Sequence, residues 1–173
     1  MTSPDGITWT GYLATEANAW IDVTWAPELG LFCAISQSGT NRVMTSPTGA
    51  AWTAYLAAEA NSWSAIVWST ELGLFCAVAA DGTNRVMTSP NGATWTSTVA
   101  AEANSWSSIV WSPELNIFVS TSITGTNRVM ISSGNQLVAS TASFTGATSG
   151  AITMKAAAAV SYTHLRAHET DSY

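Results

Sequence analysis

The sequence predicts an all-β chain: a partial β-propeller of about three four-stranded blades in an open arc. Two observations lead to this prediction. A 43-residue unit recurs without insertion or deletion, and 28 of 43 positions are identical between residues 44–86 and 87–129. Each unit also holds four short runs of β-forming residues separated by turn residues, and four strands in about 43 residues is the pattern of a propeller blade.

Four motifs recur at this spacing and divide residues 1–129 into units 1–43, 44–86 and 87–129. In the first unit they read MTSPDGITWT, TEANAW, APELGLF and GTNRVM. Met1 aligns with three methionines inside the chain, so we expect the chain to begin within a blade. The repeat decays after residue 129, and residues 130–159 are expected to form a diverged edge blade or the start of another region.

The middle unit shows the expected strands in order. We predict strands over residues 63–69 (WSAIVWS), 74–79 (LFCAVA), 85–89 (RVMTS) and 93–100 (ATWTSTVA). The turns TELG, ADGTN and PNG separate them, and the last is a tight hairpin turn. Stacked blades cover both faces of each sheet, which accounts for a charged content of only 9%.

The composition narrows the class of partner. The formal net charge of −6 argues against nucleic acid and against an anionic membrane. No apolar run approaches the ~18–20 residues that span a bilayer. Cys33 and Cys76 lie one repeat apart and Val119 takes their position in the third unit, so we predict a small buried hydrophobe, with no disulfide, metal or cofactor.

The nine tryptophans, three per unit, are predicted to form the core between blades. Strand alternation places Trp63 on the face opposite to Ile66 and Trp68. That face is the more polar one in the first unit, so we expect partial exposure of Trp20, Trp63 and Trp106. These three residues, with Asn18, Asn61 and Asn104 beside them, either pack between blades or bind a sugar ring by stacking.

One arginine recurs in each unit at the entry to a strand, as Arg42, Arg85 and Arg128. Two hypotheses remain open for this position. The arginines make hydrogen bonds or ion pairs between blades, with Glu28, Glu71 and Glu114 as candidate partners, or they converge on an anion-binding site.

The stretch SPDGITW at residues 3–9 resembles the Asp-box, or bacterial neuraminidase repeat, with the pattern Ser-x-Asp-x-Gly-x-x-Trp. Ser3, Asp5, Gly6 and Trp9 match in type, although Asp5 and Gly6 are adjacent here, and later units carry Thr48 and Asn91 in place of the aspartate. In that family the box is structural, so the resemblance implies a propeller and no catalytic residue. The units also resemble repeats of predicted phage tail-associated proteins, which implies a virion-associated or extracellular location.

The polar residues recur with the blade, whereas a sialidase needs converging arginines, a tyrosine nucleophile with its glutamate, and an acidic aspartate. Tyr12 and Tyr55, for example, become Thr98 in the third unit. We therefore predict no catalytic residue and a non-catalytic repeat module for binding or structure, with a glycan or another structural protein as partner. The alternative is a fragment of a sialidase-like glycoside hydrolase that lacks its catalytic residues.

The stretch YTHLRAHE places His164 and His168 four residues apart with Glu169 beside them, the spacing of zinc proteases on a helix. These are the only histidines of the chain. However, VSYTHLRAHET resembles a translated transposase adapter from DNA sequencing libraries. Residues 160–173 are therefore interpreted as a non-native tail and predict no metal site.

Overall fold

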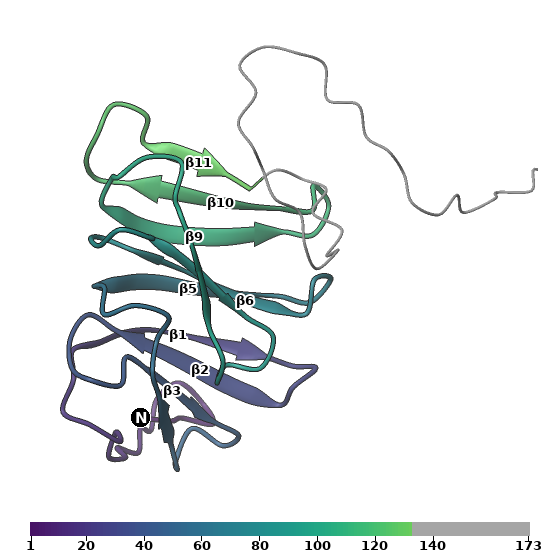
Figure 1. The fold of residues 1–173 in the computed structure, drawn as a ribbon. Helices are drawn as coiled ribbons and strands as arrows, with labels where there is room; N and C mark the ends of the chain where they lie inside the picture. Colours follow the sequence, from purple (N-terminus) through teal and green to yellow (C-terminus); the bar gives the residue numbers. More distant parts are fainter. Residues whose placement is uncertain (133–173) are drawn as a thin grey trace, which may run out of the picture. The chain divides into compact units, whose positions relative to one another are not determined.

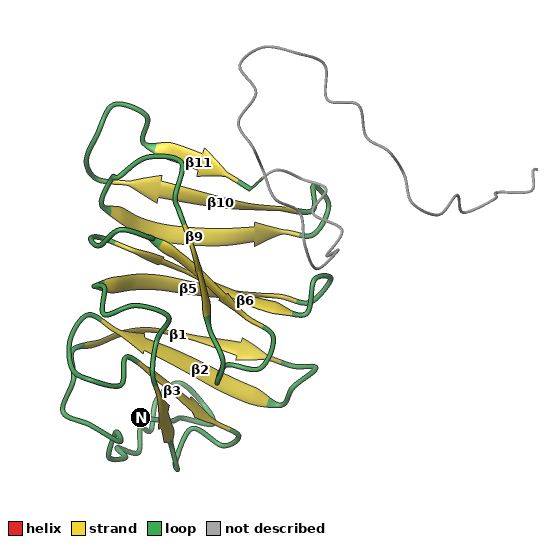
Figure 2. Ribbon diagram, viewed as in Figure 1, coloured by secondary structure: helices red, strands yellow, loops and turns green. Residues whose placement is uncertain are grey.

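The computed structural model describes residues 1–132, and the predicted tail with His164 and His168 lies outside this range. The described residues form strands, turns and loops, with no helix (Figure 2). In this part of the chain, accordingly, no helix is long and apolar enough to cross a membrane. The prediction of an all-β fold is confirmed.

Three antiparallel sheets follow one another along the chain (Figure 1). The first contains β1 (Trp20–Ala26), β2 (Leu31–Ser36), β3 (Val43–Ser46) and β4 (Thr53–Tyr55). The second contains β5 (Trp63–Ser69), β6 (Leu74–Ala79), β7 (Val86–Ser89) and β8 (Thr96–Thr98), and the third contains β9 (Trp106–Ser112), β10 (Ile117–Ser122) and β11 (Val129–Ile131). The strands pair in chain order within each sheet, which is the partial propeller-like arrangement that the repeat predicts.

A further hairpin precedes the first sheet. Thr2 and Thr10 form an isolated antiparallel bridge, joined by backbone hydrogen bonds of 2.8 and 2.9 Å. One repeat later the same position is the Thr45–Thr53 pair of β3 and β4. Residues 2–10 are thus the counterpart of the outer two strands of a blade.

Each sheet has a β-bulge just after the tryptophan that begins its first strand. In the second sheet Trp63 lies opposite Ala79 and the next pair starts at Ala65, so Ser64 is the extra residue. Because side chains alternate between the faces of a strand, one extra residue brings Trp63 to the same face as Ile66. The prediction that these two residues lie on opposite faces is therefore wrong. The register shifts at the equivalent points after Trp20 and Trp106.

The sheets pack through two different faces, which we call face A and face B. In the second sheet, face A carries Trp63, Ile66, Trp68, Phe75, Ala77 and Met87, and face B carries Ala65, Val67, Cys76, Val78 and Val86. Face A forms one core cluster with Cys33, Ile35 and Val43 from face B of the first sheet. Face B forms the next cluster with Trp106, Ile109, Phe118 and Met130 from face A of the third. Burial on both sides explains why so few positions of this sheet can be charged.

Candidate functional site

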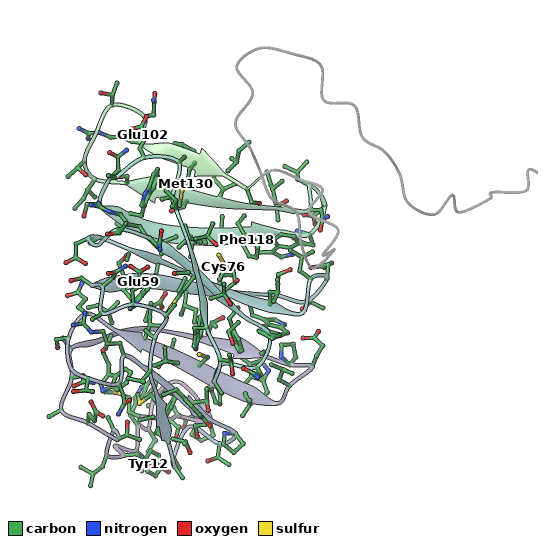
Figure 3. The ribbon with its side chains drawn as sticks, viewed as in Figure 1. Tyr12, Glu59, Cys76, Glu102, Phe118 and Met130 are labelled. Carbon is green, nitrogen blue, oxygen red and sulfur yellow. The ribbon has the colours of Figure 1, made fainter. Side chains whose placement is uncertain are left out.

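The predicted ligand-binding residues lie at one end of the sheets, which we call the polar end. It consists of the segments that enter the first strand of each sheet (residues 16–20, 59–63 and 102–106) and the loops between the second and third strands (residues 37–42, 80–85 and 123–128). Figure 3 shows Glu59 and Glu102 on the same side of the view, at successive sheets. The three predicted residue types, Trp, Asn and Arg, are therefore brought together once per sheet.

A network of side-chain hydrogen bonds joins the two segments of each sheet. In the second sheet, the Asn61 amide donates to the backbone oxygen of Asn84 at 2.6 Å and to the Glu59 carboxylate at 3.3 Å. The same carboxylate accepts hydrogen bonds from the backbone and side-chain N–H groups of Asn84. Equivalent networks contain Glu16, Asn18 and Asn41 in the first sheet, and Glu102, Asn104 and Asn127 in the third. The predicted asparagines thus hold the loop in place.

The glycine of the repeated Gly-Thr-Asn-Arg loop makes room for this network. Gly82 has a positive φ of 89°, and a β-carbon at this position would lie 2.0 Å from the Oδ1 atom of Asn61. Its counterparts in the other two loops make the same close approach to Asn18 and Asn104. The loop conformation and the asparagine therefore require each other, and only glycine satisfies both the space and the backbone angle.

The tryptophans at the polar end are more deeply buried than the sequence predicts. Trp63 and Trp106 are 0% exposed, and only Trp20 of this set keeps some accessible surface. Each indole N–H donates to the backbone oxygen of the repeated glutamate, at 3.1 Å for Trp63. The predicted partial exposure of Trp63 and Trp106 is wrong because the bulge turns them into the core.

The exposed aromatic residues lie in the N-terminal part of the chain instead. Trp9 is 57% exposed, Tyr12 45% and Trp25 41%. The prediction that all nine tryptophans form the core is therefore wrong for Trp9 and Trp25, although Trp68, the counterpart of Trp25, is buried. Face A of the first sheet explains the difference, because no other sheet of the described chain packs against it. The sequence motif around the tryptophan is the same in both units, so it could not predict that Trp25 is exposed and Trp68 is buried.

The arginines make hydrogen bonds from one sheet to the next. The Arg42 guanidinium donates to the backbone oxygen of Asn61 at 2.6 Å, and Arg85 donates to that of Asn104 at 2.8 Å. Nε of each arginine donates to the glycine oxygen of its own loop, which is also the bond that Arg128 makes. The predicted hydrogen bond between blades is confirmed for Arg42 and Arg85, whereas Arg128 bonds only its own loop among the described residues.

The glutamates proposed as arginine partners have a different role. Glu28 accepts from the indole N–H of Trp68 at 2.6 Å, and Glu71 accepts from that of Trp111 at 2.5 Å. Both bonds also cross from one sheet to the next. Glu28 and Glu71 therefore bind tryptophans instead of arginines, and Glu114 accepts a hydrogen bond from the Ser112 hydroxyl. The expectation that named these glutamates as arginine partners is wrong.

The carboxylates of the polar end are held in their ionised form. The side-chain amide of Asn41 lowers the pKa of Glu16, and that of Asn127 lowers the pKa of Glu102. The backbone N–H and hydroxyl of Ser62 likewise lower the pKa of Asp81. At neutral pH these groups accept hydrogen bonds and have no proton to give, so they suit polar binding better than general acid catalysis.

The turn that resembles an Asp-box lies at the opposite end of the sheets. The Ser3 hydroxyl accepts from the Gly6 N–H at 2.8 Å, the Asp5 carboxylate accepts from the Thr8 N–H at 2.8 Å, and the Trp9 indole donates to the Gly6 oxygen at 3.2 Å. The serine and tryptophan bonds recur at Ser46 and Trp52, and at Ser89 and Trp95. These side chains close the turn with their own hydrogen bonds.

An apolar cavity of about 200 Å³ lies between the second and third sheets, lined among others by Cys76, Phe118 and Met130, which Figure 3 labels. Burial raises the pKa of the Cys76 thiol to about 12, so the sulfur stays protonated and is a poor nucleophile. The cavity also reaches Ser132, the last described residue. Because its lining is mostly apolar and its thiol is unreactive, we assign the cavity to packing between the second and third sheets.

Within residues 1–132, no group of three or more histidine, cysteine, aspartate or glutamate side chains could hold a metal ion. A comparison of the chain with protein-family models and with curated protein sequences finds no match.

Proposed function

We propose that the chain is a non-catalytic repeat module that binds a repetitive polar ligand at its polar end, with a carbohydrate chain as the first candidate. One observation carries this proposal: an exposed threonine recurs beside the same pair of asparagine and ionised glutamate at the end of all three sheets. A catalytic centre brings different groups together at one point. Identical groups at regular intervals suit a ligand that is itself a repeat.

The buried tryptophans and asparagines belong to the scaffold, so ligand contact falls to the exposed groups beside them. Thr40, Thr83 and Thr126 are exposed in the three equivalent loops. Each threonine precedes an asparagine whose side-chain amide is bound by the ionised glutamate. Hydroxyl, amide and carboxylate groups together can exchange hydrogen bonds with sugar hydroxyls.

Three equivalent sites on one rigid scaffold favour a long ligand over a short one. Once one site holds a unit of a polymer, the next site meets a neighbouring unit at high effective concentration, which strengthens binding without any new kind of contact. A polysaccharide therefore fits the repeat better than a monosaccharide does. Aromatic stacking is limited to Trp20, because Trp63 and Trp106 have no accessible surface.

The test is a glycan array probed with the full chain, followed by a hydrolysis assay on every glycan that binds, sialosides included. We expect binding without turnover. Replacing Thr40, Thr83 and Thr126 together by alanine should weaken binding at least tenfold. The matched control replaces Thr8 and Thr94, two exposed threonines near the tight turns at the opposite end of the sheets, and should leave binding unchanged.

Three outcomes would overturn the proposal. Undiminished binding by the triple variant would exclude the polar end as the site. An array without any bound glycan would exclude carbohydrate as the ligand class. Hydrolysis of a bound sialoside would exclude a non-catalytic role and favour the glycoside hydrolase alternative.

A further inference from the structure

Face A of the first sheet is exposed along β1, although the equivalent strands of the other sheets are largely covered there. Val23 and Trp25 are 55% and 41% exposed, whereas the equivalent residues of the second sheet, Ile66 and Trp68, are 5% and 8% exposed. The residues on the two faces are nearly the same in type. A face with this composition is buried elsewhere in the chain against face B of a neighbouring sheet.

Face B of the third sheet is also uncovered in the described part of the chain. Val110 of β9 is 55% exposed, whereas its counterpart Val67 packs into the cluster between the second and third sheets. One chain therefore carries both halves of its own sheet–sheet interface. The first sheet presents the receiving half and the third sheet presents the half that covers it.

The hydrogen-bonding groups at the two exposed faces are also complementary. Within the chain, the indole of Trp68 donates to Glu28 and that of Trp111 donates to Glu71. Continuing this relation, Trp25 offers a donor at the first sheet and Glu114 offers an acceptor at the third. Among residues 1–132, no carboxylate binds the Trp25 indole and no indole binds the Glu114 carboxylate.

The arginine bond between sheets shows the same complementarity. Arg42 donates to the Asn61 oxygen and Arg85 donates to the Asn104 oxygen of the following sheet. Arg128 of the third sheet bonds only the oxygen of Gly125 among the described residues. The equivalent acceptor, the backbone oxygen of Asn18, lies at the start of the first sheet.

The N-terminal hairpin already fills the outer part of the place that a further blade would take. A β-carbon at Gly92 would lie 2.9 Å from the Thr45 Cγ2 atom of β3, and one at Gly49 would lie 2.9 Å from the Thr2 Cγ2 atom. The hairpin around Thr2 therefore sits on the first sheet as β3 and β4 sit on the second. What remains uncovered on face A is its part along β1, which the inner strands of a further blade would cover.

We propose that face A of the first sheet is the docking site for β9 and β10 of a second copy of the chain. Together with the N-terminal hairpin, these strands form one composite blade. Trp25 then donates to Glu114 of the second copy, and Arg128 of the second copy donates to the oxygen of Asn18. The hairpin takes the place of the three-residue strand β11 beside β10.

This contact joins two different faces, so it closes into a ring or continues as an open filament. Two copies with three sheets each would place about six blades around one axis, within the range of about 4–8 seen in closed propellers. We therefore expect a closed dimer in which both composite blades form at once.

The first experiment measures the mass of the full chain by sedimentation and light scattering at concentrations up to about 100 µM, which covers weak dimers as well as strong ones. We expect a dimer. Val23→Asp blocks face A and Val110→Asp blocks face B, so each variant alone should be monomeric. Mixed in equal amounts, they should form a heterodimer through the one intact pair of faces. Leu56→Asp is the control, because Leu56 is 63% exposed in the segment that joins β4 to β5, although the first and second sheets pack together.

The second experiment tests the composite blade directly. Cys33 lies opposite Thr45 and Cys76 opposite Thr88, so Thr2 of one copy should lie opposite Val119 of the other. In chains whose two natural cysteines are replaced by valine, Thr2→Cys and Val119→Cys should form a disulfide only when the two variants are mixed. Thr8→Cys mixed with Val119→Cys should form none.

The outcomes that overturn the proposal are distinct. A monomeric wild-type chain would exclude the proposed dimer. A dimer lost with Val23→Asp but kept with Val110→Asp would show face A bound to face A. A dimer without the cross-link between Thr2→Cys and Val119→Cys would exclude the composite blade. Circular dichroism of each variant separates a lost contact from a lost fold.

Discussion

The indole N–H of Trp68 donates a 2.6 Å hydrogen bond to the carboxylate of Glu28, forty residues earlier in the chain. This bond joins the second sheet to the first, and Trp111 repeats it with Glu71 between the third sheet and the second. The polar group of a buried tryptophan needs a partner, and here the partner comes from the neighbouring blade. Stacking and hydrogen bonding of the blades are thus coupled at one residue.

Trp68 therefore offers a direct measure of how much one blade contact stabilises the fold. We expect Trp68→Ala to lower the free energy of unfolding by about 3–5 kcal/mol, through the cavity and the lost hydrogen bond. Trp25→Ala is the matched control at the same repeat position, and its 41% exposure predicts a loss of about 1 kcal/mol or less.

Guanidinium unfolding followed by circular dichroism measures both variants, at a concentration low enough for a monomer. Equal losses would mean that the tryptophan acts within its own sheet. In that case the packing of one sheet on the next would contribute little at this position.

The fold was predictable because its signals are local and repeat. The strands expected over residues 63–69 and 74–79 are β5 and β6, with the same bounds. The strand expected over residues 93–100 shrinks to Thr96–Thr98, because the preceding residues close the tight turn around the asparagine side chain. Alternation could not place Trp63, since a single bulged residue reverses every assignment beyond it.

The sequence predicted which residues recur together at the candidate site, but it did not predict how exposed their side chains are. Asn61, Trp63 and Arg85 recur together because they hold one loop to one strand and one sheet to the next. A scaffold with repeated loops needs repeated polar side chains to satisfy the loop backbone. Recurrence alone therefore cannot separate a ligand-binding residue from one that binds its own chain, and burial is needed to decide.

Gly82 tests the loop network of the polar end. Gly82→Ala places a β-carbon against the Asn61 side chain, 2.0 Å from its oxygen, and we expect a loss of at least about 2 kcal/mol in unfolding free energy. Gly73→Ala is the control. Gly73 also has a positive φ, but nothing lies within 4 Å of its β-carbon position. Its counterpart Asn116 adopts a φ of 55° with a side chain.

The control accounts for the part of the backbone strain that the two positions share, because both glycines have a positive φ, of 60° at Gly73 and 89° at Gly82. Thermal and chemical unfolding of the two variants give the comparison. If the two losses agree within error, the close approach of Asn61 to the loop is not needed for stability.

The carboxylates of the polar end should make stability depend on pH. Hydrogen bonds from Asn41 and Asn127 hold the pKa of Glu16 and of Glu102 below their ordinary value of 4.5. A lowered pKa in the folded state stabilises the fold fully above the ordinary pKa, and this contribution is lost as pH falls through the lowered value. The free energy of unfolding should therefore decrease between about pH 5 and pH 3.

Glu16→Gln and Asn41→Ala should each reduce this pH dependence, since either one removes the bond between carboxylate and amide. Thr40→Ala, which changes a neighbouring hydroxyl, should leave it intact. The measurement is the denaturant midpoint as a function of pH. A pH profile unchanged in Glu16→Gln would show that this carboxylate titrates alike in the folded and unfolded chain.

The two cysteines should be unreactive until the chain unfolds. Both are free and buried, and burial raises the pKa of Cys33 as well as that of Cys76. A thiol-specific chromogenic reagent should therefore modify neither residue in native buffer and both in concentrated denaturant, because it needs an exposed thiolate. Cys76→Val should stay within about 1.5 kcal/mol of the wild type, because the third repeat already carries Val119 at this position. Rapid labelling of one cysteine in native buffer would show that its sheet interface opens, and labelling of the Cys76→Val variant would identify Cys33 as the residue exposed.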